Sequence, residues 1–166
     1  MDLTTLARLA SVFLAVQSHA DPAAARMGSP ALVAQASAIA VLSYDPPPGQ
    51  SREMMVSLLA VEALHEGRNN TSAIGPASCN ASGDCHSYGA FQLDHQPQVL
   101  GDIYAQARYA YYIIRAGYRI CPAHVLAPYA GGCHNRGAVK LADARMAEAV
   151  AGLGYVEGRE LLPGGE

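Results

Sequence analysis

Residues 54–66 read MMVSLLAVEALHE, and this stretch decides the fold. Its apolar side chains recur at helical rather than alternating spacing, which predicts a helix of the core. Ser51 stands at the N-cap position, and Gly67 follows the stretch at once. These two residues set the expected ends of the helix, and the rest of the chain must cover its apolar surface.

The segments on either side of this helix are also helical in pattern. Further helices are expected at residues 3–17, 31–44, 102–118 and 138–153, with a short one from Cys121 to about Tyr129. Residues 67–89 are rich in Asn, Ser, Gly and Cys, which predicts a long loop instead of a substantial β-sheet. Loops of this length are commonly functional. We expect one mainly α-helical domain over 1–166, with a helical part at 1–50 and a loose tail at 154–166.

Composition excludes several classes of protein. The 166 residues are 51% hydrophobic and only 15% charged, enough for one domain with a real core. No apolar run approaches the roughly 18 residues of a membrane-spanning helix. The net charge is -3 and the cationic residues look scattered along the chain, so we expect no nucleic-acid or anionic-lipid partner.

The four cysteines form two local pairs, Cys79 with Cys85 and Cys121 with Cys133. An even number of cysteines, in pairs that are close in sequence, is typical of disulfides in an exported protein. The alternative is a metal site that also uses the neighbouring histidines, His86, His124 and His134. Their spacing matches no standard zinc pattern, so we expect two disulfides and no metal.

The first twenty residues allow two interpretations. Residues 9–16 could be the apolar part of a signal peptide, with Ser18-His19-Ala20 as its cleavage site. A basic cluster is lacking before them, and the polar residues fall on one helical face, so we expect a core helix at 3–17.

Glu66 is the best candidate for an acid–base residue. It lies in the last turn of its helix, where the dipole disfavours a negative charge, and Glu62 lies on the same face one turn earlier. An apolar wall from Met55 and Leu59 adds to these effects, and together they raise the pKa of one carboxyl, as a general acid requires. Glu62 is the alternative catalyst, or it could pair with Arg52, Arg68 or Arg145.

Three short elements occur in order within residues 51–153: Glu66-Gly67, then Gly89-Ala90-Phe91-Gln92, then Tyr129-Ala130-Gly131-Gly132. They resemble the lysozyme superfamily, specifically its soluble lytic transglycosylase-like (SLT) branch. That branch has a catalytic Glu at a helix end, a turn of small residues ending in Gln, and a Tyr-containing element before the last helix. The resemblance implies a lysozyme-like helical fold. The implied substrate is bacterial peptidoglycan, cut between N-acetylmuramic acid and N-acetylglucosamine.

The chain departs from this pattern in several places. The family often has Ser where Gly67 stands, and usually Asn where Ala130 stands. In c-type lysozymes an Asp precedes the Tyr-Gly of the second element, whereas this chain has Ser87. Asp84 resembles a loop Asp that holds a water in some inverting goose-type relatives, and it is a possible secondary acid together with Glu62.

The missing Asp bears on the reaction. Glycoside hydrolysis usually needs two carboxylates, whereas a lytic transglycosylase needs one and forms a 1,6-anhydro sugar. We therefore expect a lytic transglycosylase with Glu66 as its catalyst and no cofactor. The alternatives are a muramidase of the same fold, an inactive glycan-binding module and a small metal-binding protein. We expect a monomer located in the periplasm, outside the cell or in a phage virion.

Substrate contacts are expected from the second and third elements, at Ser87, Tyr88, Gly89, Ala90, Gln92 and Tyr129. Ser87 would hydrogen-bond the N-acetyl group, Gln92 would brace the cleft, and Tyr129 would orient the catalytic Glu. Gln92 could instead be a structural amide, and Tyr129 a core residue. Tyr104, Tyr111 and Tyr118 recur every seven residues, a stripe more typical of helix packing than of sugar stacking.

Overall fold

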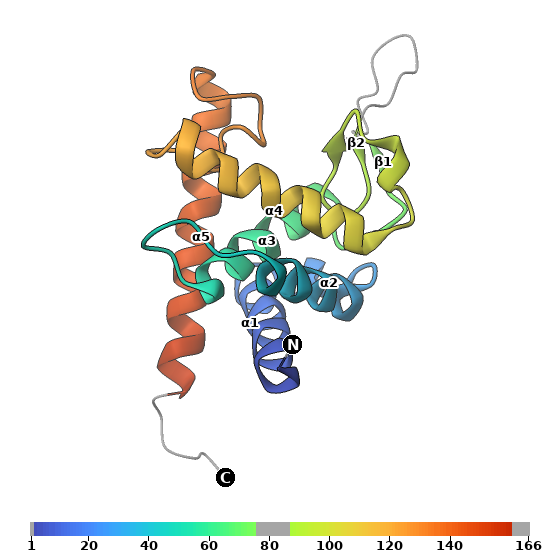
Figure 1. Cartoon of the computed structure of the whole chain (residues 1–166), viewed down its shortest axis with the longest axis vertical. Helices are drawn as coiled ribbons and strands as arrows, with labels where there is room; N and C mark the ends of the chain where they lie inside the picture. The colour runs from blue at the N-terminus through green and yellow to red at the C-terminus, as the bar shows by residue number, and fades with distance from the viewer. Residues whose placement is uncertain (1, 76–86, 161–166) are drawn as a thin grey trace.

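The computed structural model of the chain describes residues 2–75 and 87–160. Within them the chain is mainly helical, as expected (Figure 1). The α-helices are α1 (Leu3–Ala20), α2 (Pro30–Ser43), α3 (Arg52–Glu66), α4 (Ile103–Ile120) and α5 (Arg136–Glu160). Short 3-10 turns lie at Ala24–Arg26 and Pro97–Val99.

A small antiparallel sheet interrupts the region that the sequence predicted to be a loop. Its strands are β1 (Ile74–Gly75), β2 (Ser87–Tyr88) and β3 (Leu93–Asp94), in the order β1-β2-β3. Tyr88 pairs with Ile74 on one side and with Leu93 on the other. The prediction of a loop over 67–89 thus missed β1 and β2, and β3 follows that region. Strands of two residues are too short for an alternating pattern to stand out in the sequence.

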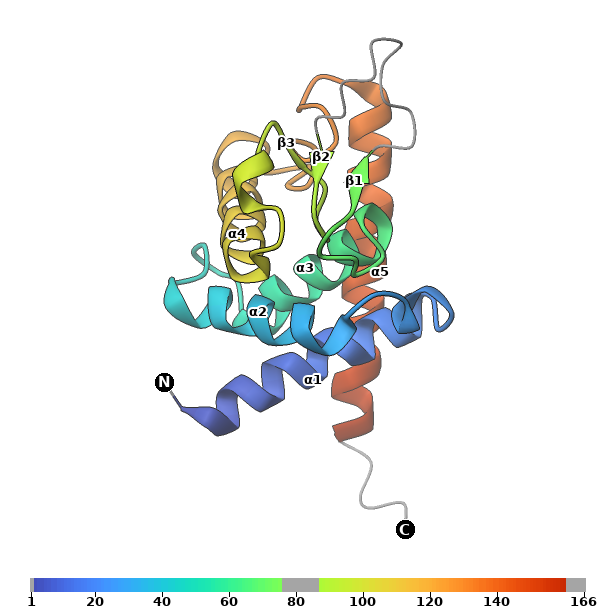
Figure 2. The same ribbon diagram turned by 90° about the vertical axis from the view of Figure 1, so that its right-hand side faces the viewer.

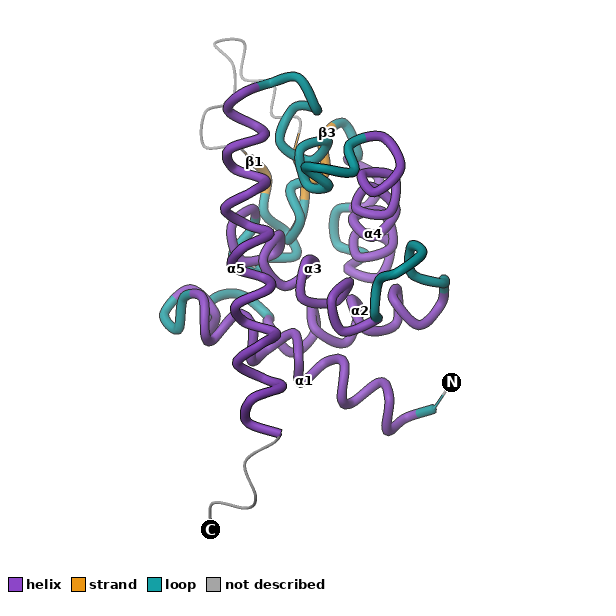
Figure 3. The backbone as a smooth tube through the Cα atoms, turned by 90° about the vertical axis from the view of Figure 1, so that its left-hand side faces the viewer, coloured by secondary structure: helices purple, strands orange, loops and turns teal. Residues whose placement is uncertain are grey.

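Helix α3 occupies the centre of the molecule. Every residue from Met55 to Leu64 is buried, and α3 packs against α1, α2, α4 and α5. Figures 2 and 3 show α3 between α4 and α5, with α1 and α2 crossing on the side away from the strands. The hydroxyl of Ser51 accepts the Met54 amide at 3.0 Å and caps the helix as expected.

Helix α1 confirms the core helix expected at residues 3–17. Leu9, Phe13 and Val16 are fully buried against the rest of the core. Among the described residues, no helix is long and apolar enough to cross a membrane.

Two sequence predictions fail near the end of the chain. Residues 121–129 form a series of turns and not a helix. Their backbone hydrogen bonds join residues three apart, as from the Tyr129 N–H to the Leu126 carbonyl. Pro128 disfavours a helix at the end of this segment, because it lacks the N–H that a helix would need at that point. Helix α5 also continues to Glu160, so residues 154–160 are helical where a loose tail was expected.

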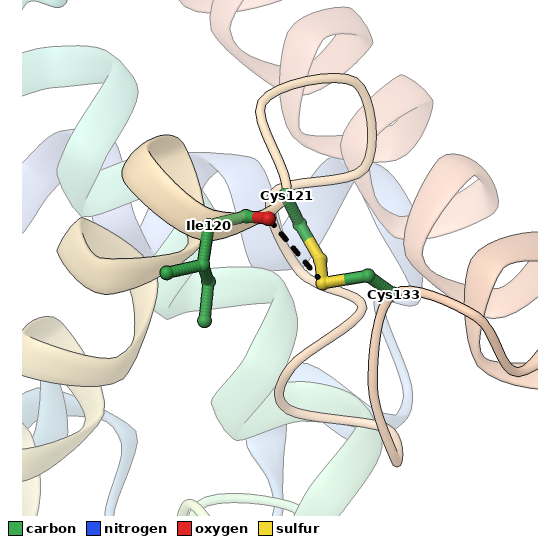
Figure 4. The surroundings of a disulfide bond; sticks show 3 residues. All are labelled: Ile120, Cys121 and Cys133. Atoms are coloured by element: carbon green, nitrogen blue, oxygen red, sulfur yellow. Dashed lines mark hydrogen bonds between the residues drawn. A yellow bond between two sulfur atoms is a disulfide. The ribbon is translucent and has the colours of Figure 1, made fainter.

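One of the two expected disulfides lies within the described residues. It joins Cys121, which ends α4, to Cys133 in the segment before α5 (Figure 4). Cys133 Sγ also lies 3.6 Å from the Ile120 carbonyl oxygen. The bond closes the segment that carries Tyr129 and Ala130. The expected pair Cys79 and Cys85 lies outside the described residues.

Candidate active site

Glu66 ends α3 beside an open cavity of about 620 Å³. The three elements singled out in the sequence meet around this cavity, which is lined by Glu66, Gly67, Ser87, Gln92, Tyr129 and Ala130 among others. His65, Arg68 and Ile74 complete much of its wall. Segments far apart in the chain therefore converge on one carboxyl group.

The small residues of the second element support the wall rather than touch the cavity. Ala90 is fully buried, and a Cβ added to Gly67 would overlap the Ala90 carbonyl. Gly89 has a φ of +77°, and it faces the side chain of Gln106. The expectation that Gly89 and Ala90 approach a sugar is therefore not met. Their small size lets the end of α3 and α4 pack against the turn. Tyr88 is half-buried in β2 and is not part of the cavity lining.

Gln106 of α4 fixes this turn, and the sequence analysis missed it. Its Oε1 accepts the Ala90 amide at 2.9 Å, while its Nε2 donates to the carbonyls of Thr71 and Val99 at 2.9 and 3.0 Å. The side chain is fully buried. A polar residue at an inward position of an otherwise apolar stripe was the signal that could have revealed it.

Gln92 lies at the cavity and is also hydrogen-bonded to the turn. It lines the cavity, and its Nε2 donates to the Gly89 carbonyl at 2.9 Å, which makes it a structural amide as well. Its φ is +46°, and Arg68, which also lines the cavity, has a φ of +48°. Non-glycine residues seldom adopt this conformation, and such positions are concentrated at functional sites.

Behind Glu66, one guanidinium joins two carboxylates. Arg145 Nη1 of α5 donates to Glu62 Oε2 and to Glu66 Oε1, each at 2.6 Å. Arg145 is only 7% exposed and Glu62 is fully buried, whereas the Glu66 side chain keeps 24% of its surface accessible. Arg145 is therefore a buried bridge and not a solvated residue. The second oxygen of Glu66, Oε2, has no hydrogen bond to a described residue.

The two carboxyls differ in environment. Burial, aided by the nearby charge of Glu66, raises the pKa of Glu62 from 4.5 to about 8, despite the opposing effect of Arg145. The raised pKa that the sequence predicted for one carboxyl is found at Glu62, while Glu66 is the carboxyl that reaches the cavity.

Tyr129 lies beside this group without the expected bond to Glu66. Its hydroxyl is buried and has no hydrogen-bond partner among the described residues. Arg145 already occupies Oε1 of Glu66. Burial and the charges of both glutamates raise the pKa of Tyr129 well above its usual value, so that it stays a neutral phenol. Glu62 Oε1 and Arg145 Nε are likewise buried without a described partner, and such unpaired groups are few in native proteins.

The described lining of the cavity contains no Asp. Asp84 lies outside the described residues. Asp94 is exposed on β3, where its carboxylate lies 3.8 Å from His95. No three His, Cys, Asp or Glu side chains within residues 2–75 and 87–160 are grouped so as to hold a metal ion. His124 instead pairs with Asp143 at 2.7 Å.

Compared with known proteins, the chain matches no family model, no curated protein and no solved structure. The function must therefore be inferred from the residues and the geometry of the cavity.

Proposed function

We propose that this protein is a lytic transglycosylase that cleaves peptidoglycan strands, with Glu66 as its single catalytic acid and base. The observation that carries the proposal is the convergence of three sequence elements on one open cavity beside Glu66. The carboxyl combines a fixed position, set by Arg145, with access to solvent. An extended glycan strand needs an open cavity of this kind, because the chain must pass through it on both sides of the bond.

The chemistry requires only one carboxyl. Glu66 Oε2 donates its proton to the glycosidic oxygen as the bond from that oxygen to C1 of N-acetylmuramic acid breaks. The 6-hydroxyl of the same sugar then attacks C1 and returns its proton to Glu66, which closes a 1,6-anhydro ring. Atoms and charge balance without water, and the acid is restored for the next cycle.

The surroundings of Glu66 suit this role. Arg145 holds Oε1 and leaves Oε2 free of described partners. A bound strand would exclude water from the partly exposed Glu66 side chain. Ser87 and Gln92 line the same cavity and carry the polar groups that would bind an N-acetyl substituent.

A transglycosylase is favoured over a muramidase by the lining of the cavity. Glu66 is the one acidic side chain among the described lining residues. Glu62 is fully buried behind it, and Asp94, which pairs across the strands with Ser87, is exposed and not among the lining residues. Hydrolysis usually needs a second carboxylate, either as nucleophile or to activate water.

The test is product analysis. Purified peptidoglycan is incubated with the protein, and the released muropeptides are analysed by mass spectrometry. We expect 1,6-anhydromuramic ends, which are lighter by one water than hydrolysed ends. Reducing ends would assign the chain to the muramidases, and no release by the folded protein would leave a glycan-binding module.

A further inference from the structure

We propose that the outer face of α4 is a second binding surface, which holds a carboxylate-bearing glycan strand away from the cavity at Glu66. The surface is the tyrosine–arginine stripe, made of Tyr104, Arg108, Tyr112, Arg115 and Arg119. This inference rests on the proposed function for the identity of the polymer. It rests on independent residues for the site, since the stripe shares none with the lining of the catalytic cavity.

The spacing of these residues places them on one face. Steps of four, four, three and four residues keep side chains on the same side of a helix. The stripe runs for about 22 Å at the helical rise of about 1.5 Å per residue. Tyr112 is 63% exposed and Tyr104 is 41% exposed, so both offer accessible aromatic faces. The sequence analysis described the cationic residues as scattered along the chain, whereas α4 places three arginines on one face.

The surface is hollowed and partly preorganised. A cavity of about 440 Å³ lies between Pro47, Pro48 and the Tyr112–Arg119 part of α4, and a smaller one of about 130 Å³ adjoins Tyr44 and Arg108. Tyr112 and Arg115 line both. The Arg115 guanidinium lies 5.9 Å from the ring centre of Tyr44 and 5.7 Å from that of Tyr111, which limits its motion.

The arginines of the stripe have no acidic partner among residues 2–75 and 87–160. Helix α4 contains three arginines and no Asp or Glu within 103–120. No ion pair joins Arg108, Arg115 or Arg119 to any residue in the described part of the chain. Asp45, beside Tyr44 in sequence, is instead paired with Arg52 at 3.5 Å. Planar guanidinium groups suit carboxylates, and tyrosine rings suit the apolar faces of sugars.

A carboxylate-bearing glycan fits this chemistry better than a polyphosphate. Nucleic-acid-binding domains are usually strongly basic, whereas this chain has a net charge of -3 and an isoelectric point near 6.0. Peptidoglycan offers both groups at once, sugar rings along the strand and carboxylates on its peptide stems. A second contact with the same polymer would keep the enzyme attached between cleavage events by raising the effective concentration of substrate.

The test measures binding separately from cleavage. Co-sedimentation with insoluble peptidoglycan is carried out on a Glu66→Gln background, with Arg108→Gln and Arg119→Gln added together. Arg26→Gln with Arg136→Gln is the matched control, because both side chains are exposed elsewhere and the change in charge is the same. We expect a loss of affinity of about tenfold for the stripe variant and less than about twofold for the control. Amidating the peptidoglycan carboxyls should lower the affinity of the Glu66→Gln protein for peptidoglycan to the same degree.

Equal affinity of the stripe variant and the Glu66→Gln background would overturn the proposal. So would a loss of binding to duplex DNA or to phosphatidylglycerol vesicles with unchanged binding to peptidoglycan. If the stripe variant binds peptidoglycan more weakly but the wild-type protein releases no muropeptide, the binding surface is supported and the enzymatic function is contradicted. If the stripe variant binds with unchanged affinity and the wild-type protein does release muropeptides, only the proposed binding surface is contradicted.

Discussion

Glu62, Arg145 and Glu66 form one hydrogen-bonded group of three side chains behind the cavity. Glu62 is fully buried and has a raised pKa, Arg145 donates to both carboxyl groups, and Glu66 reaches the cavity. A buried charge is tolerated only when it is paired, so each member depends on the other two. The pairing of Glu62 with Arg145 was one of three alternatives in the sequence, because Arg52 and Arg68 were as plausible until the helices were placed.

At this scale, the raised pKa of Glu62 gives a pH dependence of stability. Between pH 4.5 and about 8, the folded protein binds more protons than the unfolded chain. The free energy of unfolding should therefore fall as pH rises through this range. Urea titrations at several pH values should show that fall, and Glu62→Gln should flatten it. Glu157→Gln, at an exposed site, should keep the wild-type slope. An unchanged slope in Glu62→Gln would show that Glu62 titrates as it does in the unfolded chain.

Gly67 is a second residue with a specific requirement. Its backbone has φ of -116°, which any residue can adopt, so only space matters. A Cβ there would overlap the Ala90 backbone, and Gly67→Ala should cost about 1–3 kcal/mol of unfolding free energy. Gly154→Ala is the control, since nothing lies within 4 Å of its added Cβ. Equal stability of Gly67→Ala and wild type, measured by urea unfolding, would contradict the close contact.

At the scale of elements, the main helices followed from their apolar periodicity, whereas the connections did not. Burial of a helical stripe leaves a pattern that sequence alone reveals, as for α3 and α4. The strands at Ile74 and Tyr88 are two residues long, and their pairing depends on distant partners. Gln106 also escaped notice because its three hydrogen bonds all go to loops that pack on α4 only in the folded state.

The segment between α4 and α5 depends on its disulfide. Closing a short segment removes conformational freedom from the unfolded chain, and a loop of this length contributes about 3 kcal/mol. Replacing Cys121 and Cys133 by Ser should lower the unfolding free energy by about 2–4 kcal/mol. It should also reduce cleavage, since the closed segment carries Tyr129 and Ala130 into the cavity wall. Urea unfolding and muropeptide release measure the two effects. A variant as stable as wild type would show that packing alone holds the segment.

At the scale of the whole molecule, the N-terminal helix supports the site from the far side of α3. Gln17 of α1 donates to the Ala60 carbonyl and exchanges two hydrogen bonds with the amide of Asn69, at 2.9 to 3.0 Å. Asn69 has a φ of +58° and follows Arg68 at the cavity. The three motifs of the sequence did not include residues 1–50, so this support could only be seen once the chain was folded.

Gln17→Leu tests that support. The change leaves the buried Ala60 carbonyl and Asn69 amide without their partner, which should cost about 2–4 kcal/mol. Muropeptide release should fall as well, because the backbone at Arg68 loses its brace. Gln35→Leu on α2 is the matched control, since Gln35 is exposed. If both variants were as stable and active as wild type, α1 would be irrelevant to the cavity.

The central claim is that Glu66 gives its proton to the glycan from within this cavity, and the rate of muropeptide release tests it most directly. Glu66→Gln keeps the size of the side chain and can still hydrogen-bond Arg145, so the fold should be preserved by circular dichroism. We predict a fall in rate of about 10²- to 10⁴-fold for Glu66→Gln and a smaller fall for Glu62→Gln, which acts only through Arg145. A folded Glu66→Gln variant that releases muropeptides at the wild-type rate, or a loss confined to Glu62→Gln, would contradict the account.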